Sequence, residues 1–479
     1  MTSTSIAVIG AGFSGTLLSL HLLRRCPDNT RVVLIERNSQ FGRGQAYSTG
    51  NPSHLLNVPA GRMSAFHDRP MHFVEWLRTQ PPSEFPSGPP NAQSFVPRRV
   101  YGAYIRSLLG AEIRRAPRRT LELIRGEVLQ IERQSVTLRL VLDRGRVVEV
   151  GRAVLAIGNF PPEPMKVADP SFYDSIFYRP DPWAAETLTG LDAASPVVLI
   201  GTGLTMVDMV ISLLDQGHRG PIHAVSRRGL LPRPHAAGPQ MLPEETHEFP
   251  IRVNDLLRFL RQEASAAKSR GTSWQAIVDE LRPFTQDVWQ TMPLDDRKRF
   301  LRHLRPWWEV HRHRMPCPVA QRIEAARASG QLHIHAGRIS AYEIRDSIAR
   351  VILRPKGSNR DETIEAARVI ACSGPNADYS RISHPLVRSL LAQGVVRPDP
   401  LRLGLDVTPN CALLNREGAI SRRLFAVGPV TKSAFWEMTA VPDIRRQCEF
   451  LAQHLASLTK PPPQPEPTHE PKPGVNYAI

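Results

Sequence analysis

The sequence predicts an α/β fold with two similar domains, and three observations lead to this prediction. Two buried apolar runs, 6–9 and 197–200, are each followed by a glycine-rich turn and an apolar helical segment. In each half, alternating strands at 128–142 and 339–353 precede another buried strand that ends in glycine. A chain of 479 residues with 41% hydrophobic residues is also long enough for two or three packed domains.

The first glycine-rich turn predicts a dinucleotide site. Gly10, Gly12 and Gly15 permit a tight turn, close approach of the backbone to a pyrophosphate, and close packing of the following helix on its strand. Strand 32–35 then ends at Glu36, about 20 residues beyond the turn, where a carboxylate can accept hydrogen bonds from both ribose hydroxyls. A tight turn in an unrelated α/β protein is the alternative, but it explains the glycines and not Glu36.

The second turn repeats this arrangement with one change among the glycines. Gly201 and Gly203 match the first two glycines, whereas Met206 occupies the position of the third. Because a side chain at this position holds the helix away from its strand, we expect a looser nucleotide site here than in the first unit.

Arg227 distinguishes the second unit from the first. It follows Gly201 by the same interval that separates Glu36 from Gly10, so an arginine stands where the first unit has its ribose-binding acid. A guanidinium pairs with a 2′-phosphate through charge-assisted hydrogen bonds, whereas a carboxylate would repel it. We therefore expect NADP rather than NAD in the second unit. The alternative is a solvent-exposed Ser-Arg-Arg turn.

The composition limits the partners of the chain. The formal net charge is +16, but the basic residues are spread along the sequence, so we do not expect nucleic-acid binding. The positive charge would equally attract phosphorylated cofactors or anionic substrates. The five cysteines form no Cys-x-x-Cys pair, which argues against a zinc site or dithiol centre and fits a reducing, cytoplasmic setting. The apolar N-terminal run lacks a preceding basic region and contains glycines, so we expect neither a signal peptide nor membrane association.

The segment from about 253 to 329 has apolar residues at three-to-four spacing and is predicted to be helical. Within it, residues 299–314 form a dense basic and aromatic run. His311 and His313 would point in nearly opposite directions on a helix, so we expect no metal site. The run is either a solvent-exposed or domain-bridging basic face, or an arginine cluster that receives NADP phosphates or a substrate carboxylate.

A further helix is predicted near the C-terminus. Pro442 suits its first turn, and the helix, which would run to about His454, is apolar at Ile444, Phe450, Leu451 and Leu455. The start of such a helix presents free backbone N–H groups and the positive end of its dipole. The helix either brings this start to the cofactor or simply closes the core.

These features together resemble the two-dinucleotide-binding-domain flavoproteins, and within them the flavin-containing monooxygenases and their bacterial FAD/NAD(P)-binding relatives. The resemblance covers nearly the whole chain to about residue 458. It rests on the two glycine units and on the stretches 54–68 and 424–442. It implies an α/β fold with two Rossmann-like domains, FAD in the first and NADPH in the second, with the second domain inserted into the first.

The resemblance also implies the domain boundaries. The FAD-binding domain would comprise residues 1–165 and 366–458. The NAD(P)-binding domain would comprise residues 190–365, with a helical insertion at about 245–330. The proline-rich segment 459–479 cannot form a core and is expected to be a disordered tail.

The residues expected at the cofactors follow from the turns and from the resemblance. For FAD they are Gly10, Ala11, Gly12, Phe13, Ser14, Gly15, Glu36, Arg37, Asn57, Val58, Met63, Ser64, Val128, Ala156, Gly158, Gly428, Pro429, Ala440 and Val441. For NADP they are Gly201, Gly203, Leu204, Thr205, Ser226, Arg227 and Arg228.

The resemblance gives Asn57 a catalytic role. In the resembling monooxygenases, an asparagine in this loop lies beside the reactive edge of the flavin, where its amide can donate to a C4a-peroxide and fix the nicotinamide. By itself, an asparagine between Leu56 and Val58-Pro59 is more typical of a turn. Reduced flavin also carries negative charge near N1, which the start of the C-terminal helix would stabilise.

The function implied by the resemblance is that of an FAD-dependent, NADPH-using monooxygenase. NADPH would reduce the flavin, O₂ would add at C4a, and the hydroperoxide would oxygenate a small-molecule substrate that is anionic or carries an amine. The chemistry would belong to the flavin, while the protein supplies binding and a dry pocket. An NAD(P)H dehydrogenase that only transfers electrons, and a non-catalytic flavin-binding redox sensor, are the alternatives.

Overall fold

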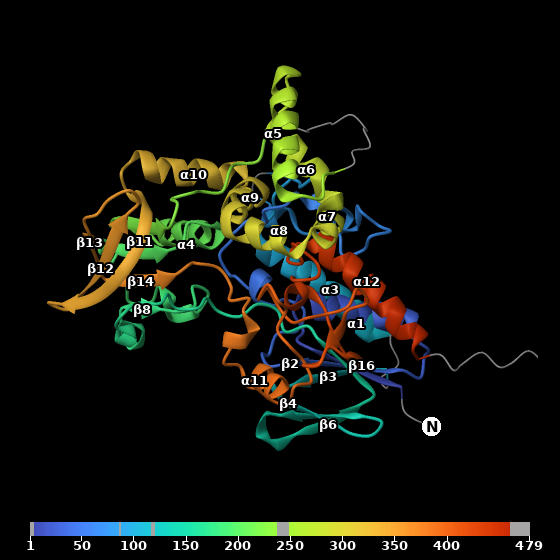
Figure 1. The fold of residues 1–479 in the computed structure, drawn as a ribbon. Helices are drawn as coiled ribbons and strands as arrows, with labels where there is room; N and C mark the ends of the chain where they lie inside the picture. The colour runs from blue at the N-terminus through green and yellow to red at the C-terminus, as the bar shows by residue number, and fades with distance from the viewer. Residues whose placement is uncertain (1–3, 86–87, 116–119, 237–248, 460–479) are drawn as a thin grey trace, which may run out of the picture.

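The computed structural model describes residues 4–85, 88–115, 120–236 and 249–459. Two sheets lie side by side, each with helices packed on it, and a group of helices rises above them at the top of Figure 1. The proline-rich tail from residue 460 lies outside the described ranges, so its disorder stays a prediction. Within those ranges, no helix is long and apolar enough to cross a membrane.

The first sheet has the strand order β15-β16-β7-β1-β2-β3, and the strands from β16 to β3 are parallel. The strands are β1 (Ser5–Ile9), β2 (Arg31–Glu36), β3 (Leu121–Arg125), β7 (Arg152–Leu155), β15 (Ala412–Leu414) and β16 (Ile420–Ala426). Because β15 and β16 come from the end of the chain, the first domain is discontinuous, as the resemblance implied.

Helices cover one face of this sheet and a small antiparallel sheet covers the other. The helices are α1 (Phe13–Arg25), α2 (His72–Leu77), α3 (Arg98–Arg115) and α12 (Val441–Ser457). On the opposite face lie β4 (Val128–Arg133), β5 (Leu138–Leu142), β6 (Val147–Val150) and α11 (Pro385–Ala392). Every residue of β1 is buried, which explains why this strand is a continuous apolar run rather than an alternating one.

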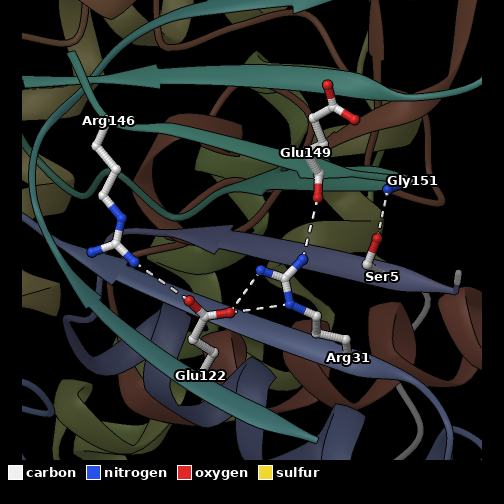
Figure 2. A network of polar contacts seen from close by, with 6 residues as sticks. All are labelled: Ser5, Arg31, Glu122, Arg146, Glu149 and Gly151. Carbon is white, nitrogen blue, oxygen red and sulfur yellow. Dashed lines mark hydrogen bonds and ion pairs between the residues drawn. The ribbon is translucent and has the colours of Figure 1, made fainter. Parts of the chain in front are cut away.

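A polar network secures the end of the first sheet that lies away from the glycine turn (Figure 2). Arg31 on β2 pairs with Glu122 on β3 at 2.6 Å and donates to the carbonyl oxygen of Glu149 at 3.3 Å. The N–H of Gly151 donates to the hydroxyl of Ser5 at 3.0 Å. Together these contacts fix the small antiparallel sheet to the strand that precedes the first turn.

The second sheet has the order β13-β12-β11-β10-β9-β14-β8, in which β11 to β8 are parallel and β12 and β13 are antiparallel. Its strands are β8 (Tyr178–Arg179), β9 (Val197–Ile200), β10 (Ile222–Ser226), β11 (Leu332–Arg345), β12 (Ile348–Pro355), β13 (Glu362–Ala366) and β14 (Arg368–Ala371). Helices α4 (Leu204–Asp215) and α10 (Cys317–Ala328) pack on one face of the parallel strands.

The second sheet extends beyond residues 190–365 at both ends. Strand β14, which lies within the range 366–458, pairs with β9 in the second sheet. Likewise β8, which precedes residue 190, pairs with β14. The chain therefore returns to the first domain only after residue 371, because the apolar run 369–371 fills the second sheet beside β9.

The helical insertion comprises five α-helices. They are α5 (Val253–Ser269), α6 (Trp274–Leu281), α7 (Thr285–Thr291), α8 (Leu294–Arg299) and α9 (Arg305–Arg312), with a π-helical turn at 300–304 between the last two. An apolar cavity of about 490 Å³ lies among these helices, and five of the seven tryptophans of the chain line it. The three-to-four spacing therefore predicted the helices correctly.

Helix α12 buries three of its four large apolar residues named above. Ile444, Leu451 and Leu455 are buried, but Phe450 is 49% exposed. A residue next to Leu451 on an α-helix points about 100° away from it, which places Phe450 outside the buried stripe.

Candidate functional site

The first glycine turn is closed so tightly that only glycine fits at two of its positions. Gly10 has φ +102°, and a Cβ there would collide with the carbonyl oxygen of Ala156 at the end of β7. A Cβ on Gly15 would collide with the carbonyl oxygen of Gly10. Helix α1 therefore begins directly against the turn, and its first N–H groups are presented where a pyrophosphate could bind.

Glu36 is fixed at the end of β2 by two backbone N–H groups. One carboxylate oxygen accepts from the N–H of Ala11 at 2.8 Å, and the other accepts from the N–H of Asn38 at 3.0 Å. A carboxylate oxygen has capacity for further hydrogen bonds, so Glu36 can also accept from ribose hydroxyls. The turn and this acid together fit the sugar and phosphates of FAD.

The segment that returns from β16 meets the start of α1. Gly428 has φ +80°, and a Cβ there would lie 2.5 Å from the hydroxyl oxygen of Ser14. Its N–H donates to the side-chain oxygen of Gln447 on α12 at 2.8 Å. Gly428, Ser14 and α12 are thus brought together, as the proposed FAD site requires.

The second turn repeats only part of this geometry. Gly201 has φ +118°, and a Cβ there would collide with the carbonyl oxygen of Cys372 after β14. A Cβ on Gly203 would meet no atom within 4 Å. Met206 is completely buried in the core between α4 and the second sheet. The first glycine is therefore essential in both domains, whereas the later positions differ.

Arg227 is exposed beyond the end of β10 and makes no ion pair with any residue in the described ranges. Ser226 before it accepts a hydrogen bond from the hydroxyl of Thr202 at 2.9 Å and from the N–H of Gly229 at 3.0 Å. The guanidinium of Arg228 lies 5.8 Å from the ring of Trp307. The turn is thus fixed by Ser226, while Arg227 is available for a phosphate.

A cavity of about 1140 Å³ lies between the two domains and the helical insertion. Of the residues predicted for the site, its lining includes Asn57, Val58, Met63, Gly158, Gly201, Gly203, Leu204, Thr205, Ser226, Arg227, Arg228, Pro429, Ala440 and Val441. The second turn, the Asn57 loop and the start of α12 therefore face one shared space.

The remaining predicted residues do not line this cavity. They are Gly10, Ala11, Gly12, Phe13, Ser14, Gly15, Glu36, Arg37, Ser64, Val128, Ala156 and Gly428. Most belong to the first turn and its surroundings. Ser64 and Val128 are buried, Ser64 donating to the carbonyl oxygen of Arg69 at 2.7 Å, so their side chains serve the packing of the first domain.

Asn57 lies in the loop before a 3₁₀ turn at Ala60–Arg62, and both line the cavity. The ring of His235, from the second domain, donates to the carbonyl oxygen of Asn57 through Nε2 at 3.0 Å. Burial lowers the pKa of His235, which favours its neutral form. This bond holds the backbone of the loop, and Asn57 is among the residues that line the cavity.

Buried polar contacts tie the same loop to helix α4. Arg98 pairs with Asp208 at 2.7 Å, and His54 contacts the carbonyl oxygen of Asp208 at 3.0 Å and the hydroxyl of Ser212 at 2.9 Å. Burial raises the pKa of Asp208, against the opposing charge of Arg98. These contacts could not be predicted from the sequence, because no local pattern links positions so far apart in the chain.

Arg305, Arg312 and Arg314 of the basic run at 299–314 line the cavity. Arg312 pairs with Glu437 at 3.0 Å, and Trp308 donates to the same carboxylate at 2.6 Å. Burial opposes ionisation of Glu437, but Arg312 keeps its pKa below the ordinary value. Arg305 pairs with Glu309 at 2.7 Å. The solvent-exposed interpretation is therefore wrong for Arg312, which is 8% exposed.

The structure also shows how the possible metal ligands and the cysteine thiols are placed. In the part of the chain that the structure describes, no group of three or more His, Cys, Asp or Glu residues could hold a metal ion. Cys317 and Cys372 both line the cavity, and neither is in a disulfide. Burial raises the pKa of the Cys372 thiol, so this residue is not a reactive thiolate.

Comparison with known proteins agrees with this geometry. Residues 7–160 match the model of a protein family described as FAD-NAD(P)-binding. Ornithine hydroxylase from Pseudomonas aeruginosa is similar over 96% of this chain and 100% of that chain, with a TM-score of 0.66 and 16% sequence identity. The chain has the fold of a two-dinucleotide-binding-domain flavoprotein. The predicted fold class is thus confirmed.

Two further structures show how widely this flavoprotein fold is used. Ornithine N-hydroxylase from Kutzneria sp. 744, in a structure with reduced FAD, NADP⁺ and L-ornithine, covers 96% of this chain and 100% of its own, with a TM-score of 0.63 and 14% identity. Thioredoxin reductase from Lactococcus lactis covers 95% and 99%, with a TM-score of 0.51 and 10% identity. No curated protein matches the sequence. At such identities the likeness establishes the fold and not the reaction.

Proposed function

We propose that this chain is an FAD-dependent, NADPH-using monooxygenase that acts on a small amine. The observation that carries the proposal is the shared cavity, which brings the Asn57 loop and the start of α12 to face the second glycine turn. Ligand pockets usually enclose roughly 300–1,000 Å³, so about 1140 Å³ has room for a nicotinamide nucleotide and a substrate together. The amine is suggested by the ornithine-hydroxylating enzymes with this fold.

Each domain would hold one cofactor. The first turn with Glu36 would bind FAD, and the second turn with Arg227 would bind NADPH through its 2′-phosphate. When bound, FAD would accept a hydride from NADPH and activate O₂. The protein would hold the two cofactors in contact across the cavity and exclude water from the space between them.

Asn57 and α12 would stabilise negative charge at the reacting edge. Asn57 lines the cavity, where its side-chain amide would donate a hydrogen bond, while His235 holds its backbone. Ala440 and Val441 line the cavity at the start of α12, where the free N–H groups and the helix dipole favour an anion. We also propose a reducing, cytoplasmic setting, because none of the five cysteines is in a disulfide.

The first experiment is a test of cofactor and reaction. Purified protein should be yellow, and it should oxidise NADPH and consume O₂ when a substrate amine is added. A monooxygenase forms hydroxylated product in proportion to the NADPH consumed. A colourless protein would remove the proposal, and rapid NADPH oxidation that yields only hydrogen peroxide or reduced dye would favour the dehydrogenase.

Asn57→Leu should uncouple oxygenation from NADPH oxidation. Removing one preorganised donor to a developing anion costs about 10²- to 10³-fold in rate, so product per NADPH should fall at least about tenfold and hydrogen peroxide should rise. Asn254→Leu, at an exposed asparagine on α5 outside the cavity, is the matched control. Unchanged coupling in Asn57→Leu would remove the role proposed for this residue.

A further inference from the structure

Three arginines from separate segments face the part of the cavity next to the Asn57 loop. Arg62 ends the 3₁₀ turn that follows Asn57, Arg282 follows α6, and Arg314 follows α9. All three line the cavity. The side chain of Arg282 is 11% exposed and that of Arg314 is 3% exposed, so neither is an ordinary surface cation.

The protein satisfies these guanidinium groups only in part. Arg282 Nη2 lies 3.7 Å from Asp443, beyond hydrogen-bond distance, and this buried nitrogen has no hydrogen-bond partner in the described structure. Arg314 pairs with Asp279 through Nη2, but its buried Nε has no partner among the described residues. A buried charged donor without an acceptor is costly, so the protein compensates these two guanidinium groups only in part.

The three charges also lie close enough to repel one another. Burial, Arg312 and then Arg62 lower the pKa of Arg282 to about 10, although Asp443 and Glu437 oppose the shift. Burial lowers the pKa of Arg314 as well, and Arg62 adds to that effect. An anion bound beside these like charges would relieve the repulsion.

The residues that line the cavity carry more positive than negative charge, although Asp208 and Glu437 behind the lining pair with Arg98 and Arg312. Its basic lining residues are Arg62, Arg98, Arg227, Arg228, Arg282, Arg305, Arg312, Arg314 and Lys432, whereas its acidic lining residues in the described ranges are Asp279 and Glu309. The phosphates of a nicotinamide nucleotide would account for the cations at the second turn. Arg62, Arg282 and Arg314 come from segments other than the second turn, which leaves them available for a different anion.

We propose that Arg62, Arg282 and Arg314 form a subsite for a carboxylate of the substrate. The proposal rests on the function proposed above and defines its substrate class as an acid that also carries the amine to be oxidised. Planar guanidinium groups bind a carboxylate through paired hydrogen bonds, and Arg62 links the subsite to the loop that carries Asn57.

Binding measurements on the flavin-loaded protein test this subsite without turnover. The probes are glutarate, a dicarboxylate with no nucleotide, its neutral diamide glutaramide, and 2′,5′-ADP, which carries the 2′-phosphate of NADP. Isothermal titration at constant ionic strength should show that glutarate binds and glutaramide does not. Arg62→Gln should weaken glutarate at least about tenfold, since a hydrogen bond to a charged group contributes about 1.5–3 kcal/mol.

The variants separate the two possible sources of the anion. Arg62→Gln should leave 2′,5′-ADP binding unchanged, and Arg227→Gln should weaken 2′,5′-ADP but not glutarate. Arg62 is exposed, so its variant should fold normally, while Arg282→Gln provides a second test at the buried group. Equal binding of glutarate and glutaramide would overturn the subsite, as would displacement of glutarate by 2′,5′-ADP. Glutarate binding in a protein that fails to oxygenate would overturn only the proposed function.

Discussion

The first domain has glycine at the third position of its turn, and the second domain has Met206 at the equivalent position. At Gly15 a single added carbon would collide with the carbonyl oxygen of Gly10, so α1 lies directly on the turn. Met206 is instead fully buried between α4 and the second sheet. The first site is therefore closed around its phosphate-binding N–H groups, whereas the second gains core packing and loses that closeness.

Glu36 and Arg227, which end the second strand of their respective units, show the same contrast between a closed first site and an open second site. Glu36 already accepts hydrogen bonds from Ala11 and Asn38, so it forms part of its turn before any cofactor binds. Arg227 is exposed and has no ion-pair partner among the described residues. This contrast suits a cofactor that remains bound in the first domain and one that is exchanged during each turnover in the second.

Gly15→Ala should have the largest effect. The added methyl group must separate α1 from the turn, and such overpacking should cost at least about 3 kcal/mol and release FAD. Thermal unfolding and the flavin content of purified protein provide the measurement. Gly203→Ala is the matched control in the second domain, where a Cβ meets open space, and it should cost less than about 1 kcal/mol. Equal losses in the two variants would contradict the contrast.

The turns could be predicted from sequence because their determinants are local. A buried strand, the glycine spacing and the residue at the end of the next strand all lie within about 30 residues. The parallel pairing of β1 with β2 and of β9 with β10 follows directly from these units. The domain boundary could not be found in this way, since the apolar run at 369–371 is equally suited to either sheet.

The cavity wall could not be predicted for a related reason. Arg98 meets Asp208, and Arg312 meets Glu437, across more than a hundred residues of sequence. The basic run at 299–314 indicated a charged region, but only the packing of α9 shows which of its residues are buried.

Arg227→Glu should produce the next largest effect, by making the second unit resemble the first. Replacing a charge-assisted contact by a repulsive one should reduce the preference for NADPH over NADH by at least about 10- to 100-fold. The ratio of kcat/KM for the two nucleotides measures this preference. Arg228→Gln, next to Trp307, should change it much less. Turnover of the parent protein that is equally efficient with NADH would show that Arg227 does not select the nucleotide.

Glu36→Gln should have the smallest effect and tests whether the acid is part of the turn or only a contact for the ribose. The amide oxygen of glutamine can still accept one of the two backbone N–H bonds from Ala11 and Asn38, so the fold should be kept. FAD affinity should fall about tenfold, because a neutral acceptor forms weaker hydrogen bonds with the ribose. Fluorescence titration of the flavin-free protein measures this affinity.

Glu127→Gln is the control for that substitution. Glu127 lies just after β3 and contacts His384 at 2.9 Å and Arg37 at 3.7 Å, but neither of the N–H groups that Glu36 holds. Loss of FAD affinity in Glu36→Gln alone, with unchanged thermal stability, would show that the carboxylate acts on the cofactor. Loss of thermal stability in Glu36→Gln would instead show that Glu36 mainly stabilises the turn. The first site would then differ from the second because its protein structure is preformed, and not because Glu36 contacts the cofactor.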